Sequence, residues 1–178
     1  MRTKGDQSGF TLLEILVVLL IIGIMMGMAV LSVGPGDREK GTRDELARLK
    51  GVLDLVSREA VLDAREWGIR FADHGYLFLV LDDKNQWRSP PAGDRTLQPR
   101  RLPETMPMVL RVEGVPVDKP EVKPDDPPQV LVSSDGEMTP FELELTVPGA
   151  TRTGEKIAFR LSASLTGRMQ IERLAVTP

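Results

Sequence analysis

The chain of 178 residues contains no cysteine and a single histidine. The lack of cysteine excludes disulfide bonds, thiol catalysis and thiolate metal sites. His74 precedes Gly75 in a predicted turn, and no His-x-x-x-His or nucleophile-elbow motif supplies the partners that a metal site or a general base needs. We therefore expect that the chain is not an enzyme, such as a membrane-anchored hydrolase, and that it has no metal site and no cofactor.

A strong excess of charge of either sign is also missing. The chain has 23 Lys and Arg against 26 Asp and Glu, a net charge of −3. Binding to nucleic acid requires a basic surface that contacts several phosphates. Arg95, Arg100, Arg101 and Arg111 have acidic residues close by in the sequence. We therefore expect no nucleic-acid partner.

One long apolar run is present, over residues 10–33, and Glu14 is its only ionisable group. As a helix this run spans roughly 36 Å, which exceeds the length that about 20 residues need to cross a bilayer. Arg2 and Lys4 precede the run and place residues 1–9 in the cytoplasm by the positive-inside rule. The alternative is a secretory signal peptide, which the length of the run and the lack of an A-x-A-like site disfavour. The pattern predicts one membrane-spanning helix over residues 10–33.

A carboxylate inside an apolar run needs an explanation. A charged side chain near the centre of a bilayer costs roughly 2.5–3.5 kcal/mol and usually marks a functional position with a partner. Glu14 is such a position, unless it lies shallow enough to reach the headgroups.

The block Gly9-Phe10-Thr11-Leu12-Leu13-Glu14, followed by the apolar run, resembles the start of type IV prepilins and type II secretion pseudopilins. The resemblance implies that residues 1–9 are a leader, that a prepilin peptidase cleaves between Gly9 and Phe10, and that the same enzyme methylates the new amine of Phe10. It also implies a role for Glu14 in subunit assembly. A buried carboxylate needs a cation, and the amine of a neighbouring subunit supplies one.

A second helical segment is expected within residues 34–68. Gly34-Pro35-Gly36 marks either a helix end or a kink, and Thr42-Arg43-Asp44-Glu45 has the spacing of a capping box. Gly68 is the expected residue after the helix end. Between Glu45 and Gly68, apolar residues recur at spacings of three and four, which predicts an amphipathic helix that packs on a domain. These helix-packing residues are Leu46, Leu49, Leu53, Val56, Ala60, Ala64 and Trp67.

The remaining residues, 69–178, predict an antiparallel β domain of about seven or eight strands. Phe141, Leu143 and Leu145 alternate with Glu142 and Glu144, so one face of the sheet is expected to be wet. Two proline-containing loops, 89–107 and an exposed, mobile 113–128, interrupt the strands. The predicted fold class is α+β and pilin-like, with a long N-terminal helix packed on an antiparallel sheet or sandwich. The expected strands are 69–72, 76–81, 86–88, 108–112, 130–133, 141–147, 156–163 and 168–176.

Three further segments, 59–69, 75–78 with Trp87 downstream, and 133–141, resemble the H-type minor pseudopilin of type II secretion systems. The resemblance implies a structural subunit at or near the tip of a periplasmic pseudopilus, which helps to export folded proteins across the outer membrane. The implied partners are the prepilin peptidase, the major pseudopilin, the other minor pseudopilins and the inner-membrane assembly platform. The implied location is the inner membrane, with residues 34–178 in the periplasm. The alternative is a minor pilin of a type IV pilus, which assembles pili and can serve DNA uptake.

Overall fold

The structure is a computed structural model that describes residues 12–30, 35–91, 93–117, 127–149 and 156–176. The chain divides into two units, residues 1–37 and residues 38–178, which are described separately. The two proteolytic-site residues expected from the sequence, Gly9 and Phe10, lie outside the described residues.

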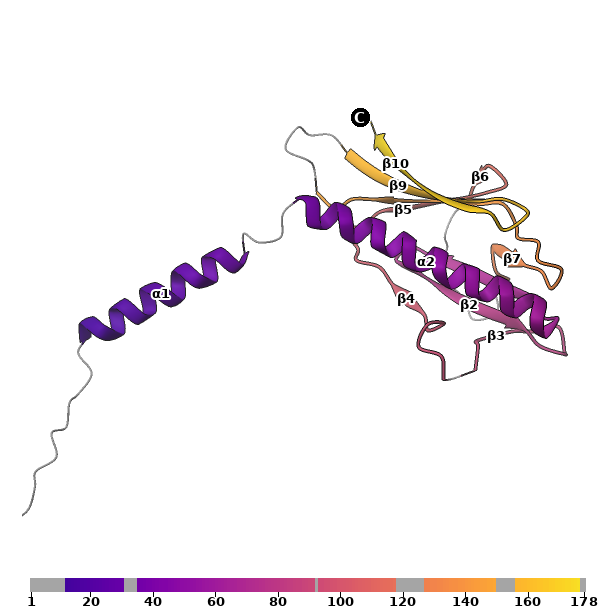
Figure 1. Cartoon of the computed structure of the whole chain (residues 1–178), viewed down its shortest axis with the longest axis horizontal. Helices are drawn as coiled ribbons and strands as arrows, with labels where there is room; N and C mark the ends of the chain where they lie inside the picture. Colours follow the sequence, from indigo (N-terminus) through magenta and orange to yellow (C-terminus); the bar gives the residue numbers. More distant parts are fainter. Residues whose placement is uncertain (1–11, 31–34, 92, 118–126, 150–155, 177–178) are drawn as a thin grey trace, which may run out of the picture. The chain divides into compact units, whose positions relative to one another are not determined.

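The described part of the first unit consists mainly of α1, Leu12–Val30 (Figure 1). Its side chains from Leu12 to Met25 are all exposed, and all except Glu14 and Gly23 are large and apolar. Among the described residues, no helix combines the length and the apolar character needed to cross a membrane. The expected membrane helix over residues 10–33 extends beyond the described residues at both ends, and it stays a prediction.

The helix α2 covers Pro35–Asp63 and begins earlier than the capping-box spacing predicted. Proline is favoured at the first helical position because it has no N–H to leave unsatisfied there. Thr42 lies inside the helix, where its hydroxyl donates to the carbonyl of Arg38 at 3.0 Å. The capping-box interpretation of Thr42 and Glu45 is therefore wrong.

The end of α2 also differs from the prediction. The chain leaves the helix at Ala64, whose φ of 48° is left-handed, and the amide of Arg65 donates to the carbonyl of Ala60 at 3.1 Å. This is a Schellman arrangement with alanine in the position that glycine usually takes. Gly68, the predicted residue after the helix, lies within a strand instead.

Two antiparallel sheets follow α2 in the second unit (Figure 1). The first sheet has the order β3-β2-β1-β7, with β4 also paired to β2. The second has the order β10-β9-β8-β5-β6. The strands of the first sheet are β1 (Trp67–Ala72), β2 (Gly75–Leu81), β3 (Trp87–Arg88), β4 (Arg100–Arg101) and β7 (Val130–Val132). Those of the second sheet are β5 (Met108–Val112), β6 (Val115–Pro116), β8 (Phe141–Thr146), β9 (Lys156–Ala163) and β10 (Met169–Val176).

The predicted wet face is confirmed on β8, where buried and half-buried residues alternate. Glu144 lies opposite Arg160 of β9 in the register, and the Arg160 Nη2 is 2.6 Å from its carboxylate. Such directly opposed pairs of unlike charge are the favourable cross-strand arrangement. On the inner face Phe141 meets Phe71 of β1, with ring centroids 5.9 Å apart, so the two sheets share one core.

The predicted α+β, pilin-like fold is confirmed, although two short strands occur where loops were expected. β4 lies inside the predicted loop 89–107, which also sends Leu97, Leu102 and Met106 into the core. β6 forms a hairpin with β5 through Glu113 and Gly114, both at positive φ, so residues 113–117 are an ordered turn and strand. Residues 118–126 lie outside the described residues.

Candidate functional site

The carboxylate of Glu14 lies in the first turn of α1. Its side chain is exposed, as are those of the apolar neighbours Leu13 and Leu16, at 73% and 61%. A helix that is apolar on every side needs lipid or apolar protein around it. The positive end of the helix dipole favours a carboxylate in this turn. The described helix α1 is thus apolar along its length, with one negative charge in its first turn.

Five of the seven predicted helix-packing residues lie on α2 and are buried in the domain core; Trp67 is also buried in the core but lies on β1, so its prediction as a helix residue is wrong. Six of them are at most 5% exposed, and they form part of one hydrophobic cluster with both sheets. These six are Leu46, Leu49, Leu53, Val56, Ala60 and Trp67. Ala64 is exposed and lies beyond the helix end, so its prediction as a packing residue is wrong. The reason is the Schellman turn, which breaks the helical period four residues after Ala60.

The polar side of α2 carries a buried carboxylate, Glu45, which is 8% exposed. Arg100 of β4 binds it with two prongs, Nη2 at 2.6 Å from Oε2 and Nε at 3.0 Å from Oε1. The hydroxyl of Tyr76 on β2 donates to Oε1 at 2.9 Å, and Arg48 donates to that hydroxyl at 2.8 Å. We call Glu45, Arg48, Tyr76 and Arg100 the Glu45 cluster.

The electrostatics of this cluster keep Tyr76 protonated. Burial is the largest cause, and the nearby Glu45 carboxylate adds to it, so the pKa of Tyr76 lies far above its ordinary value of 10.0. The neutral phenol of Tyr76 thus donates a hydrogen bond to the Glu45 carboxylate and accepts one from the Arg48 guanidinium. The cluster ties α2 to β2 and to β4.

The cluster determines where the segment after β3 lies. Residue Arg100 pairs with Tyr76 in the β2–β4 register, next to Gly75, where an added Cβ would overlap the carbonyl of Arg100. The sequence signalled neither Tyr76 nor Arg100 as a partner of Glu45, because the ion pair joins residues 55 positions apart. The role of these residues is structural. The cluster joins α2, β2 and β4, and both oxygens of the Glu45 carboxylate accept hydrogen bonds within it.

A pocket of about 430 Å³ opens at the C-terminal end of α2, and we call it the α2 pocket. Three carboxylates line it, Glu59, Asp63 and Asp94, with Arg65 as the lining cation. Its other lining residues are Leu62, Trp67, Val80, Pro91, Gly93 and Leu97. Within the described residues, no group of three or more His, Asp or Glu is arranged to hold a metal ion.

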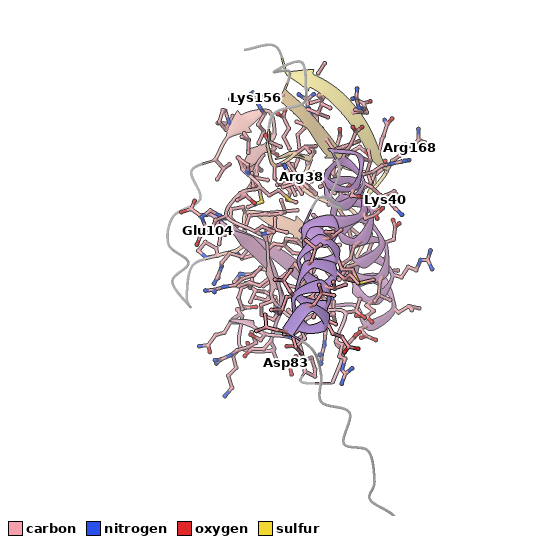
Figure 2. The ribbon with its side chains drawn as sticks, turned by 90° about the vertical axis from the view of Figure 1, so that its left-hand side faces the viewer. Arg38, Lys40, Asp83, Glu104, Lys156 and Arg168 are labelled. Carbon is pink, nitrogen blue, oxygen red and sulfur yellow. The ribbon has the colours of Figure 1, made fainter. Side chains whose placement is uncertain are left out.

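The surface of the second unit carries charged side chains of both signs (Figure 2). Figure 2 shows Arg38 and Lys156 toward one end of the domain and Asp83 toward the other. Positive and negative side chains are interspersed, and several pair with each other, such as Arg173 with Glu39 at 2.7 Å.

Comparison with protein families assigns two regions of the chain. Residues 4–30 match the prokaryotic N-terminal methylation motif, and residues 45–167 match the family described as type II transport protein GspH. The first region contains Gly9, Phe10 and Glu14, and the second contains the Glu45 cluster and every described strand except β10.

Related proteins agree with these matches. The type II secretion system protein H of Pseudomonas aeruginosa is 36% identical over 150 residues, covering 80% of this chain and 85% of the relative. The corresponding protein of Aeromonas hydrophila is 31% identical over 151 residues, covering 80% and 82%. The type II secretion system core protein G of Escherichia coli is 41% identical over 63 residues, covering 35% and 39%.

Solved structures share the fold. The minor pseudopilin EpsH of Vibrio cholerae superposes with a TM-score of 0.59 at 22% identity, covering 73% of this chain and 94% of that chain. The solution structure of Escherichia coli GspH gives a TM-score of 0.52, also at 22% identity, covering 78% and 88%.

Proposed function

Because the chain belongs to the GspH family of type II transport proteins, we propose that it is a minor pseudopilin, a structural subunit of a periplasmic type II secretion pseudopilus. The observation that carries this proposal is the order of two matches in one chain, a methylation motif over residues 4–30 and a GspH domain over residues 45–167. An apolar rod followed by a globular domain is the layout that a filament subunit needs.

The proposed mechanism is mechanical. The apolar residues of α1 anchor the precursor in the inner membrane and then pack with the corresponding helices of other subunits in the filament. Glu14 offers its carboxylate to the methylated amine of a neighbouring subunit, which offsets the cost of a charge in apolar surroundings. The β domain is displayed outside that helical core, at or near the tip, and we propose no catalytic activity for it.

The proposed partners follow from the same two regions. A prepilin peptidase processes the Gly9–Phe10 bond and methylates Phe10, which lie within the matched methylation motif. The resemblance of part of the chain to a core protein G supports packing with a major subunit of that kind. The other minor pseudopilins and the inner-membrane assembly platform complete the set. The relatives are type II secretion proteins, which favours this assembly over the type IV pilus.

The direct test is the mature N-terminus. Cells that produce the secretion system should yield a chain that begins with N-methylated Phe10, as read by mass spectrometry of the terminal peptide. Replacing Gly9 with leucine should leave the unprocessed precursor. Gly5→Leu is the matched control, because it adds the same side chain to the same leader outside the predicted cleavage site. A mature chain that begins elsewhere, or normal processing of Gly9→Leu, would refute the proposal.

A further inference from the structure

The α2 pocket combines the features of a side-chain binding site, because three carboxylates, one cation, Arg65, and several apolar side chains line it together. Its carboxylates come from two separated segments, Glu59 and Asp63 from α2 and Asp94 from the loop after β3. Its walls include the ring of Trp67, which is 5% exposed and belongs to the core, and Leu97, which is 6% exposed. These two lining residues are therefore part of the domain core.

The negative charge of the pocket is concentrated. Burial, and then repulsion from Asp94 and Asp63, raise the pKa of Glu59. The pKa of Asp94 is lowered, because the Thr96 side chain and its amide, 2.7 Å from Oδ1, hydrogen-bond to the carboxylate. Among the described residues, no ion pair within 4.0 Å engages Glu59, Asp63 or Asp94. A cation brought from outside would relieve this repulsion.

We propose that the α2 pocket receives an arginine or lysine side chain of another pseudopilus subunit. The cation lies between Glu59 and Asp63, and the aliphatic stem lies against Leu62 and the ring of Trp67. Aromatic rings attract cations over their faces, and long basic side chains bury their stems along apolar surface. This inference rests on the proposed function, because it identifies a contact within the same filament.

The rim of the pocket indicates a protein rather than a free ion. Leu62 lines the pocket and is 81% exposed, so a large apolar side chain lies beside the carboxylates. A small cation would leave this side chain in water. A protein surface that presents a basic side chain covers Leu62 and pairs the charges together, which is the composition of an interface with an apolar core and a charged rim.

The experiment uses the full chain in cells that produce the complete secretion system. A photoreactive amino acid replaces Leu62, and mass spectrometry maps the cross-linked subunit and peptide. We expect that peptide to carry an arginine or lysine beside the cross-linked position. Neutralising two carboxylates with Glu59→Gln and Asp63→Asn should lower the yield about tenfold, which corresponds to about 1.4 kcal/mol. Asp54→Asn with Asp83→Asn is the matched control, since it removes the same charge outside the pocket.

A charge exchange completes the test. Replacing the identified basic residue with glutamate should abolish the cross-link, and Glu59→Lys should restore it. A cross-link to a second copy of this chain, to a peptide without a basic residue, or one insensitive to neutralisation would overturn the inference. Processing at Phe10 and recovery in the pseudopilus fraction are measured in the same cells. If both remain while the cross-link result is negative, the inference fails and the proposed function stands.

Discussion

The guanidinium of Arg100 donates two hydrogen bonds to the carboxylate of Glu45, from Nη2 to Oε2 at 2.6 Å and from Nε to Oε1 at 3.0 Å. The carboxylate side chain is 9% exposed and the guanidinium 43% exposed, so the pair joins a buried group on α2 to a partly open strand. Two-pronged arginine–carboxylate pairs are stronger and more directional than single contacts. The pair holds β4, and with it the segment between β3 and β5, against α2.

Replacing Glu45 with glutamine should destabilise the domain. The amide keeps one acceptor but removes the charge that Arg100 and Tyr76 bind, and hydrogen bonds to charged groups contribute about 2 kcal/mol. We expect the free energy of unfolding to fall by about that amount, measured by urea titration of the full chain in detergent micelles with tryptophan fluorescence. Glu39→Gln is the control on the same helix, because its exposed pair with Arg173 should contribute about 0.5 kcal/mol. Equal losses in the two variants would contradict the assignment.

Alkaline pH should lower the free energy of unfolding through the titration of Tyr76. Because Tyr76 is the only tyrosine of the chain, its titration can be followed by absorbance. The folded-state pKa of Tyr76 is raised above its ordinary value of 10.0, so the folded state keeps the proton after the unfolded state has lost it. The stabilisation is fully present below pH 10 and is lost as the pH rises through the folded-state pKa. Tyrosinate absorbance should appear only as the domain unfolds. In Tyr76→Phe the free energy of unfolding should depend less on pH in this range, whereas an equal slope would argue against Tyr76.

The third prediction uses two glycines in opposite environments. A Cβ on Gly68 would lie 2.6 Å from the Cβ of Pro128 and 3.2 Å from Cζ3 of Trp87. Gly68→Ala should therefore lower the free energy of unfolding by about 1–3 kcal/mol through overpacking. Gly51 is exposed within α2, and an added Cβ there meets nothing within 4 Å. Gly51→Ala should raise stability by about 1 kcal/mol. Denaturant titration of both variants checks the opposite signs, and changes of the same sign would contradict the packing argument.

The elements that the sequence predicts well are those whose pattern is local and repeated. The stripe on α2 from Leu46 to Ala60 and the alternation along β8 both follow from periodic burial, and the structure has both. The ends of α2 were mispredicted because local motifs compete there with tertiary contacts. Glu45 had the spacing of a capping residue, yet its carboxylate pairs with Arg100 from a strand far along the chain.

The candidate sites divide in the same way. Gly9, Phe10 and Glu14 follow from a contiguous motif, which the family match over residues 4–30 includes. The α2 pocket follows from no motif, because Glu59 and Asp94 come together only when the loop after β3 folds back beside α2. Leu97 is an example. It is only 6% exposed, but the surrounding proline-containing segment has no repeated apolar pattern that would predict its burial. Non-local packing of this kind needs the fold.

The fourth prediction concerns the end of α2. Ala64 adopts a left-handed φ of 48°, which costs a non-glycine residue about 1 kcal/mol. Ala64→Gly should therefore raise the free energy of unfolding by about 1 kcal/mol. Ala47 is exposed in the interior of α2, and the same substitution there should lower stability by a similar amount, about 1 kcal/mol. Denaturant titration of the pair provides the measurement. A loss at both positions would show that the helix continues past residue 64.

The last prediction concerns Glu14 and the proposed filament. Glu14→Gln keeps the shape of the side chain but removes its charge, so membrane insertion should be unchanged or improved, since a charge within lipid costs roughly 2.5–3.5 kcal/mol. Assembly should suffer, because the glutamine cannot form the ion pair with the amine of a neighbouring subunit. We expect incorporation into the pseudopilus to fall about tenfold, equivalent to about 1.4 kcal/mol, as measured by cross-linking to the major subunit in membranes. Asp37→Asn removes one charge just beyond the apolar helix and should assemble normally. Normal incorporation of Glu14→Gln would contradict the proposed ion pair. It would not contradict the proposed cleavage after Gly9, because the two steps depend on different groups.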